Sequence, residues 1–192
     1  MNSLISNAIC NANSVLRTIT RKVCKRSWKN AHRASRVADM SAQPHHPAHM
    51  TPDELARATA AAMYENDACS KALGFEIVEV RPGYARLRMA VRDDFLNGHQ
   101  ICHGGLIFTL ADSTFAFACN TYNINTVAAG CSIEFLRPVK GGDVLTAEAV
   151  EQTLSGRTGI YDIRVTNRAE ETVAMFRGKS AQIKGNLIPT GD

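Results

Sequence analysis

The sequence predicts an α+β domain in which an antiparallel sheet wraps one long, buried helix. Two observations support this prediction. The run from Gly104 to Cys119 is apolar on every side of a helix and carries a single acid, Asp112. Four segments after it alternate apolar and polar residues with the period of two that is typical of strands. Because a sheet with one apolar face can bury such a helix, the two observations predict one shared core.

Boundary residues mark the elements before the central helix. The segment Thr-Pro-Asp-Glu at 51–54 combines a capping box with an early proline, so a helix should begin there and reach about Tyr64. Asp67 can cap a second short turn that stops at Gly74. Strands are expected at 75–80 and 85–91, with a turn at 81–83 and a loop at 93–100.

Turns separate the four strands predicted after the central helix. In the first strand, the alternate apolar residues from Val127 to Phe135 should face one way, with Ser132 and Glu134 opposite. A proline and two glycines at 138–142 should end that strand. The remaining strands are expected at 144–152, 158–167 and 172–183.

The length of the chain fits one domain, and its positive charge is concentrated in the first 49 residues. With 192 residues and 45% apolar content, the chain can form one domain with a real core, which we expect at 50–186, followed by a tail at 187–192. The net charge of +4 arises in residues 1–49, where eight Lys/Arg and one acid give +7. The remainder holds 14 Lys/Arg and 17 Asp/Glu, a net −3, so the domain itself is not expected to bind nucleic acid.

The basic leader, residues 1–49, leaves three interpretations open. It is a disordered tail or upstream translation with Met40 or Met50 as the true start, an organellar transit peptide, or an arm for nucleic acid or a membrane surface. It has no apolar stretch long enough for a secretory signal. Its histidines at 45–49 are better explained as part of a flexible linker than as a metal site. Six cysteines without a C-x-x-C pair indicate a reduced compartment, so we expect a cytoplasmic protein.

Asp112 is the strongest candidate for a functional residue. The apolar run around it is too short to span a bilayer, and Ser113 and Thr114 lie at its middle, so a membrane helix is excluded. In a core, an ionised carboxylate is costly unless it is hydrogen-bonded or functional. Ser113 and Thr114 could help to keep Asp112 ionised near neutral pH.

The start of the central helix is a second candidate. Gly104 and Gly105 allow a tight turn into the helix and leave amide N–H groups that can hold a carbonyl oxygen. Asp112 follows Gly104 by eight positions, which is roughly 12 Å of helix at 1.5 Å per residue. A reacting carbonyl must lie about 3 Å from both groups, so a site that uses both needs two antiparallel copies of the helix.

Six motifs in this order resemble the hotdog-fold thioesterases, and most closely their phenylacetate-degradation type, PaaI. The resemblance runs from about Met63 to Ile183. The motifs are Met-Tyr-Glu-Asn-Asp-Ala at 63–68, Leu-Asn-Gly-His-Gln at 96–100, His-Gly-Gly at 103–105, Leu-Ala-Asp at 110–112, Ile-Glu-Phe-Leu-Arg-Pro at 133–138 and Phe-Arg-Gly-Lys-Ser at 176–180.

This resemblance implies hydrolysis of phenylacetyl-CoA or hydroxyphenylacetyl-CoA type thioesters to free acid and coenzyme A. It assigns the nucleophile or general base to Asp112, the oxyanion amide to Gly104 and the placement of the attacking group to Asn97. It also implies a homodimer with its site at the interface, often paired into a homotetramer. No metal and no cofactor are implied, since coenzyme A belongs to the substrate, and no membrane partner is expected.

Substrate-binding candidates follow from the same resemblance. Coenzyme A carries phosphates, for which Arg177 and Lys179 on one strand face are the first candidates and Arg157 and Arg137 weaker ones. Phe176 should face the core instead. The remaining candidates are Gly105 as a substitute amide, His103 as the residue that closes the turn into the helix, and Tyr64, Met63 and Phe115 around the acyl group.

Four other hypotheses are weaker. Cys102 beside His103 lacks a third orienting group for nucleophilic catalysis, and His99 with His103 lacks further zinc ligands. A hotdog dehydratase is disfavoured because the chain has no D-x-N-P-x-H run. An acyl-CoA sensor that contacts DNA through the leader lacks a helix-turn-helix pattern.

Overall fold

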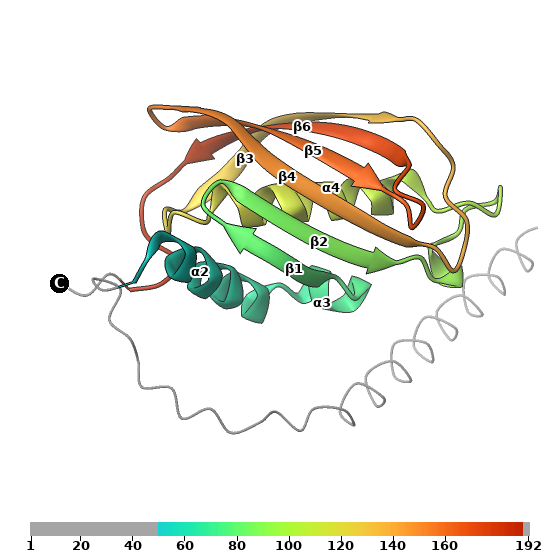
Figure 1. Ribbon diagram of the computed structural model, residues 1–192, viewed down its shortest axis with the longest axis horizontal. Helices are drawn as coiled ribbons and strands as arrows, with labels where there is room; N and C mark the ends of the chain where they lie inside the picture. Colours follow the sequence, from blue (N-terminus) through green and yellow to red (C-terminus); the bar gives the residue numbers. More distant parts are fainter. Residues whose placement is uncertain (1–49, 190–192) are drawn as a thin grey trace, which may run out of the picture. The chain divides into compact units, whose positions relative to one another are not determined.

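A six-stranded antiparallel sheet lies against one long helix, α4, in the computed structural model, which describes residues 50–189 (Figure 1). The expected α+β class is confirmed, and α4 has the predicted bounds. The leader, including Met40 and the histidines at 45–49, lies outside the described residues. In chain order the elements are α2 (Pro52–Asn66), α3 (Ala68–Leu73), β1 (Glu76–Arg81), β2 (Tyr84–Ala90), the 3₁₀ turn η2 (Asp93–Phe95), α4 (Gly104–Cys119), β3 (Thr126–Phe135), β4 (Val144–Ser155), β5 (Thr158–Thr166) and β6 (Thr172–Gln182).

The two short helices begin and end at the residues that the sequence marks. Thr51 Oγ1 accepts a hydrogen bond from the Glu54 amide, while the Glu54 carboxylate accepts one from the Thr51 amide, so the capping box is complete. Asp67 caps α3 by accepting from the Ser70 amide. Gly74 ends α3 in the left-handed conformation, at a φ of 70°.

Strand order separates β3 from β4, the next strand in sequence. The order is β1-β2-β4-β5-β6-β3, so β4 pairs with β2 from before the helix and β3 pairs with β6. Four strands do follow α4, as predicted, and they lie side by side in the sheet, but β3 comes after β6 and not before β4. The long segment from 136 to 143 carries the chain from one part of the sheet to another, and no local pattern announces such a crossing.

β3 forms an edge of the sheet and is exposed along most of its length. Val127 is 47% exposed, and Phe135 and Leu136 are each 53% exposed. A bulge between Ala128 and Gly130 shifts the pairing of β3 with β6. Because of this bulge, the apolar side chains from Val127 to Phe135 do not share one face, which corrects the simple alternation predicted from the sequence.

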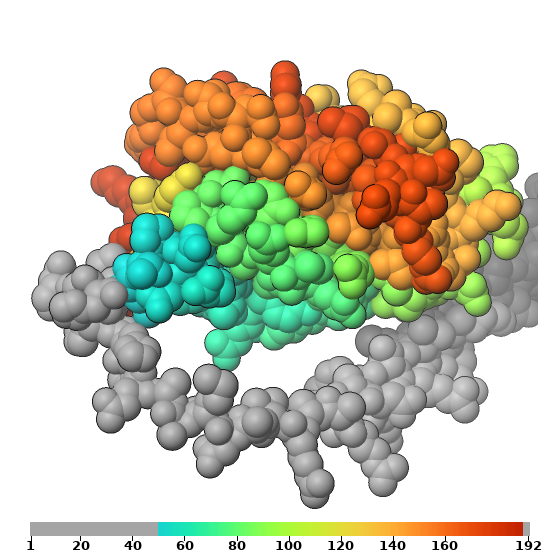
Figure 2. Space-filling view, in the orientation of Figure 1, coloured from blue at the N-terminus to red at the C-terminus, as the bar shows by residue number. Residues whose placement is uncertain are grey.

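The inner face of the sheet forms the core with α4. Leu87, Ile163 and Phe176 from three strands are buried against the helix, and the Phe176 ring lies 6.0 Å from that of Phe115. The burial of Phe176 is as predicted. Figures 1 and 2 view the sheet from its outer side, where β4 passes in front of α4.

α4 is not buried all round, contrary to expectation. Asp112 and its neighbours on one side of the helix remain only partly buried, because the sheet covers the opposite side. No helix among residues 50–189 is long and apolar enough to cross a membrane. The partly buried side of α4 carries Leu106, Phe108, Thr109, Asp112, Ser113 and Ala116.

Candidate active site

A cavity of about 330 Å³ lies at the start of α4. Its lining brings together Asn97 from the loop before the helix, Gly104 from the first turn, and Phe135 and Arg137 from the end of β3 and beyond. Its volume falls within the range of small-molecule sites. Two of the three residues assigned catalytic roles by resemblance therefore share one cavity.

The first turn of α4 leaves one amide free for a ligand. The Gly105 amide donates to Nδ1 of His103 at 3.0 Å, so His103 caps the helix and closes the turn, as expected. Gly105 is then unavailable as a substitute oxyanion donor. The Gly104 amide has no acceptor among the described residues. A Cβ atom at Gly104 would lie 3.2 Å from the Phe135 ring, so glycine permits this close aromatic contact.

Asn97 presents its amide NH₂ group rather than its oxygen. Its Oδ1 accepts from the His99 amide at 2.9 Å, and its backbone N–H donates to the Ile101 carbonyl. Nδ2 has no partner within residues 50–189 and belongs to a residue that lines the cavity. Asn97 can therefore donate a hydrogen bond to a bound ligand or water.

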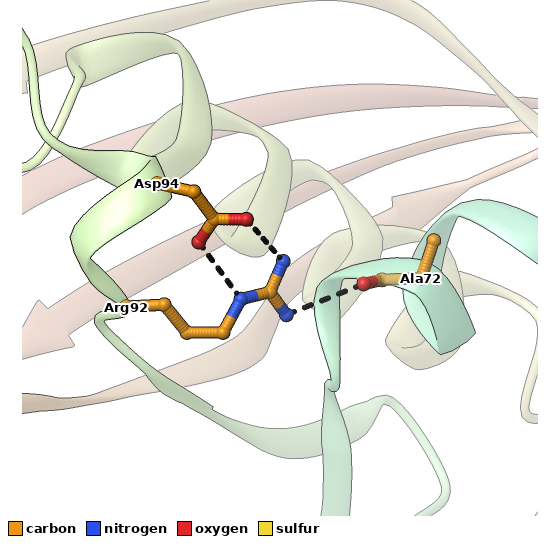
Figure 3. A network of polar contacts seen from close by, with 3 residues as sticks. All are labelled: Ala72, Arg92 and Asp94. Atoms are coloured by element: carbon orange, nitrogen blue, oxygen red, sulfur yellow. Dashed lines mark hydrogen bonds and ion pairs between the residues drawn. The ribbon is translucent and has the colours of Figure 1, made fainter. Parts of the chain in front are cut away.

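Arg92 holds the segment that leads to Asn97 (Figure 3). Its guanidinium donates to both carboxylate oxygens of Asp94, at 3.0 and 3.3 Å, and to the Ala72 carbonyl near the end of α3. It also stacks over the Phe95 ring, 4.0 Å from the centroid. A cation at the carboxyl end of a helix is favourable, so α3 serves as an anchor for this loop.

A second cavity, of about 480 Å³, surrounds Asp112. Its walls are largely apolar and include Met63 and Phe115, two of the residues expected around the acyl group. Burial raises the pKa of the Asp112 carboxyl above that of an ordinary aspartate. The carboxyl has no hydrogen bond or ion pair among the described residues. Thr114, expected to support it, instead donates to the Leu110 carbonyl at 2.7 Å.

The two cavities lie at opposite ends of β3. Thr126, Val127 and Ala128 at its start line the Asp112 cavity, whereas Phe135 at its end lines the Gly104 cavity. No lining residue is common to both cavities. One chain therefore holds Gly104 and Asp112 in two separate cavities, which we term the two half-sites.

The other predicted binding residues line neither half-site. Arg177 and Lys179 share the outer face of β6, as expected, but the Arg177 guanidinium binds both oxygens of Asp162, at 2.6 and 2.7 Å. Arg157 donates to the Gln182 carbonyl at 2.9 Å. The Tyr64 hydroxyl donates to the Phe75 carbonyl. The side chains of Arg177, Arg157 and Tyr64 thus each have a structural partner that sequence alone does not reveal.

The cysteines at the half-sites are poor nucleophiles. Burial raises the pKa of the Cys102 thiol to about 11 and that of the Cys119 thiol to about 12, so both stay protonated at neutral pH. This argues against a Cys102–His103 pair. Among residues 50–189, no three His, Cys, Asp or Glu side chains gather where they could hold a metal ion.

Some residues around the Asp112 cavity were missed by sequence reasoning. Ile183 and Leu187 line it, and both lie at or beyond the end of the last strand. The segment that contains them is hydrogen-bonded to Asn123, so the chain does not leave the domain after residue 186 as expected. No periodic pattern marks Leu187, and Ile183, expected as the last residue of the final strand, lies just beyond the end of β6 at Gln182.

Comparisons with known proteins agree with this arrangement. The sequence profile of the thioesterase superfamily matches residues 99–174. The acyl-coenzyme A thioesterase PaaI of Escherichia coli (strain K12) is 52% identical over 126 residues, which are 66% of this chain and 90% of that protein. The E. coli PaaI structure, from the phenylacetic acid degradation operon, matches with a TM-score of 0.70 and 49% identity, over 71% of this chain and 99% of that one.

A more distant match was solved with a ligand. A Streptococcus mutans protein bound to acetyl-CoA has a TM-score of 0.56 and 27% identity, over 58% of this chain and 90% of that one. The sheet, the central helix and the two half-sites define a hotdog-fold thioesterase. The chain belongs to the PaaI family of this superfamily.

Proposed function

We propose that the protein hydrolyses acyl-CoA thioesters of the phenylacetyl-CoA or hydroxyphenylacetyl-CoA type in phenylacetate degradation. The observation that carries this proposal is the division of chemical groups along α4: a free amide at Gly104 and a desolvated carboxylate in an apolar cavity at Asp112. The E. coli relative is named an acyl-CoA thioesterase, and the S. mutans relative was solved with acetyl-CoA. Beyond coenzyme A, which is part of the substrate, the reaction needs no cofactor.

The complete site forms between two copies of the chain. The half-sites of one protomer are separated by about 12 Å of helix, whereas a thioester carbonyl must contact both groups. The unpaired edge of β3 offers a way to join them. If two β3 strands pair antiparallel about a two-fold axis near their middle, the start of each lies beside the end of the other. The Asp112 cavity of one protomer then adjoins the Gly104 cavity of its partner.

In this composite site, the carbonyl oxygen of the thioester accepts a hydrogen bond from the Gly104 amide. Asp112 of the other copy acts on the carbonyl carbon, either directly or by taking a proton from water, and both routes begin with an ionised carboxylate. The Asn97 NH₂ group positions the attacking oxygen. The C–S bond breaks, the sulfur leaves as the thiol of coenzyme A, and one water is consumed to give the free acid.

The coenzyme A end of the substrate lies on the Gly104 side. Arg137 lines that cavity, and its guanidinium is exposed except for one bond to the Thr172 carbonyl. A guanidinium is well suited to phosphate groups. Because Arg177 already binds Asp162, we place Arg137 ahead of Arg177, Lys179 and Arg157 as the phosphate contact.

Two dimers can join through the outer face of the sheet. A hollow of about 620 Å³ there is lined by charges of both signs, including Arg86, Arg164 and Glu148, and the buried Nε of Arg86 has no acceptor in the described part of the chain. A surface with both charges can complement its own copy across a two-fold axis. This favours the homotetramer, and Arg164→Glu should reduce it to dimers in light-scattering measurements.

The cysteine usage supports a cytoplasmic location.

Subunit complementation tests the shared site. Asp112→Asn and Gly104→Pro should each abolish most hydrolysis of phenylacetyl-CoA, because each damages every site in its own dimer. Co-expression of the two variants should restore about one quarter of wild-type activity, since half of random pairs are mixed and each mixed pair has one intact site. No recovery in verified mixed dimers would show that both groups act within one protomer. Absence of activity in the wild type toward a panel of acyl-CoA thioesters would overturn the enzyme assignment and favour an acyl-CoA sensor.

A further inference from the structure

The chain after β6 folds back against the turn that follows α4. The Ile183 amide donates to the Asn125 carbonyl at 2.7 Å, and the Asn125 amide donates to the Gly185 carbonyl at 3.0 Å. Residues 183–189, which we term the C-terminal strap, thus continue beyond the last strand as ordered irregular backbone. The strap also lies outside residues 99–174, the part that matches the superfamily profile.

Asn123 fastens the C-terminal strap with its whole side chain. Its Oδ1 accepts from the amides of Leu187 and Ile188 at 3.0 and 2.9 Å, and its Nδ2 donates to the Ile188 carbonyl at 3.0 Å. Asn186 adds a bond from its own side chain to the Asn123 carbonyl. Asn123 is only 2% exposed and has a φ of 58°, a left-handed conformation that asparagine tolerates better than most residues. A buried amide satisfied in this way is costly to displace.

This fastening fixes a side chain that lines the catalytic cavity. Leu187 lies between the two amides that Asn123 holds and contributes to the wall of the Asp112 cavity, as does Ile183. The remaining apolar lining comes from α2, α4 and β3 and includes Met63, Phe115 and Val127. Ile183 and Leu187 are therefore the apolar parts of this wall that depend on irregular backbone, and of the two Leu187 is the one that Asn123 holds.

We propose that Leu187, positioned by Asn123, is a specificity-determining residue that limits the size of the acyl group. This inference rests on the proposed function, because it assumes that the acyl group occupies the cavity next to Asp112. A leucine held at both neighbouring amides cannot swing away at low cost, so it excludes acyl groups longer than the cavity accepts. A compact arylacyl group is accommodated, whereas a longer chain meets the Leu187 side chain.

The test compares kcat/KM for phenylacetyl-CoA with that for 4-phenylbutyryl-CoA, which is two methylenes longer. Leu187→Ala should shift the ratio toward the longer substrate by about tenfold or more, the scale of discrimination for a methylene in an apolar pocket. Asn123→Gly should shift it in the same direction, because glycine keeps the positive φ without strain and removes only the side-chain hydrogen bonds.

Ile188→Ala is the matched control. Ile188 is the next residue of the C-terminal strap and is partly buried, but it does not line the cavity, so the ratio should stay at the wild-type value. Thermal unfolding of all three variants checks that they are folded. If Leu187→Ala hydrolyses phenylacetyl-CoA and its ratio is unchanged, the strap does not determine specificity and the inference is overturned. If the wild type hydrolyses neither substrate nor any other acyl-CoA, the proposed function fails instead.

Discussion

The two half-sites of one protomer differ in what they can offer a thioester. The cavity at the start of α4 supplies donors and a cation: the Gly104 amide, the Asn97 NH₂ group and the Arg137 guanidinium. The cavity in the middle of α4 supplies an acid among apolar walls. The first suits a carbonyl oxygen and a phosphorylated leaving group, and the second suits an apolar acyl group under attack. In the dimer proposed above, a single helix thus carries two complementary halves that serve different copies of the chain.

The acid should be the more sensitive half. Asp112→Asn should lower kcat for phenylacetyl-CoA by about 10³-fold or more, because both chemical routes need a carboxylate. Thioester absorbance measures the rate without a thiol reagent, which would also react with exposed cysteines such as Cys69. The variant should stay folded and retain its oligomeric state. If kcat falls less than tenfold, Asp112 is neither the nucleophile nor the general base.

At the other half-site, a proline substitution can remove the Gly104 N–H with little other change to the helix. Gly104 is the first helical residue, where proline is tolerated, and His103 has a ψ of 128°, which suits a residue before proline. Gly104→Pro should lower kcat about 10²-fold relative to Gly104→Ala, the typical cost of losing one oxyanion donor. The alanine variant is the control, since its Cβ meets the same Phe135 ring but its N–H remains. Equal rates would assign the oxyanion to another donor.

The pH profile should report the desolvated acid. Burial raises the pKa of Asp112, so the protonated, inactive form persists to higher pH than for an exposed aspartate, whose pKa is about 3.9. Below the raised pKa, kcat/KM should fall about tenfold per pH unit, and this limb should be absent from the residual activity of Asp112→Asn. If kcat/KM instead begins to fall at the ordinary aspartate pKa, the carboxyl is not desolvated in the active dimer.

The same shift makes a prediction about stability. For an acid with a raised folded-state pKa, ionisation disfavours the fold, and the cost develops as pH rises from the unfolded value through the folded one. Asp112→Asn should therefore unfold at a higher temperature than the wild type at neutral pH. The difference should shrink as pH falls toward about 4. Scanning calorimetry at both pH values measures it, and a constant difference would point to another cause.

The smallest effects should distinguish the two arginine candidates. Arg137→Gln should raise KM for phenylacetyl-CoA several-fold with little change in kcat, because it removes a contact with the leaving group and not with the reacting carbon. Arg177→Gln should change KM by less than about twofold, since that exposed side chain is paired with Asp162 on the outer face. If Arg177→Gln raises KM more than Arg137→Gln does, the phosphate groups bind at β6 and not at Arg137.

Sequence reasoning succeeded where a local signal exists. Thr51, Asp67 and Gly74 mark helix ends through hydrogen bonds or backbone angles of their own, and α4 was placed at its observed bounds. Sequence reasoning does not predict the edge position of β3 or its bulge, because the pairing of β3 with β6 depends on contacts between residues distant in sequence. For the same reason, the Arg177–Asp162 pair was not foreseen.

The candidate site shows the same division. Asp112 and Gly104 stand out because an acid in an apolar run and two glycines at a helix start conflict with simple packing. Asn123 and Leu187 do not stand out, since asparagine in a turn and leucine near a chain end are common. Their importance comes only from the hydrogen bonds that join segments more than sixty residues apart.

The open edge of β3 also bears on how the chain is produced. A strand edge with unpaired backbone groups accepts almost any extended segment, and proteins often guard such edges with lysine or proline. β3 has neither, and Glu134 is its only charged residue. Once a chain has folded, pairing with a folded copy and capture by an unfolded chain are both second order in chain concentration, so dilution slows the two equally. The ratio of folded to unfolded chain decides which reaction prevails, so a low fraction of unfolded material should protect this edge where dilution does not.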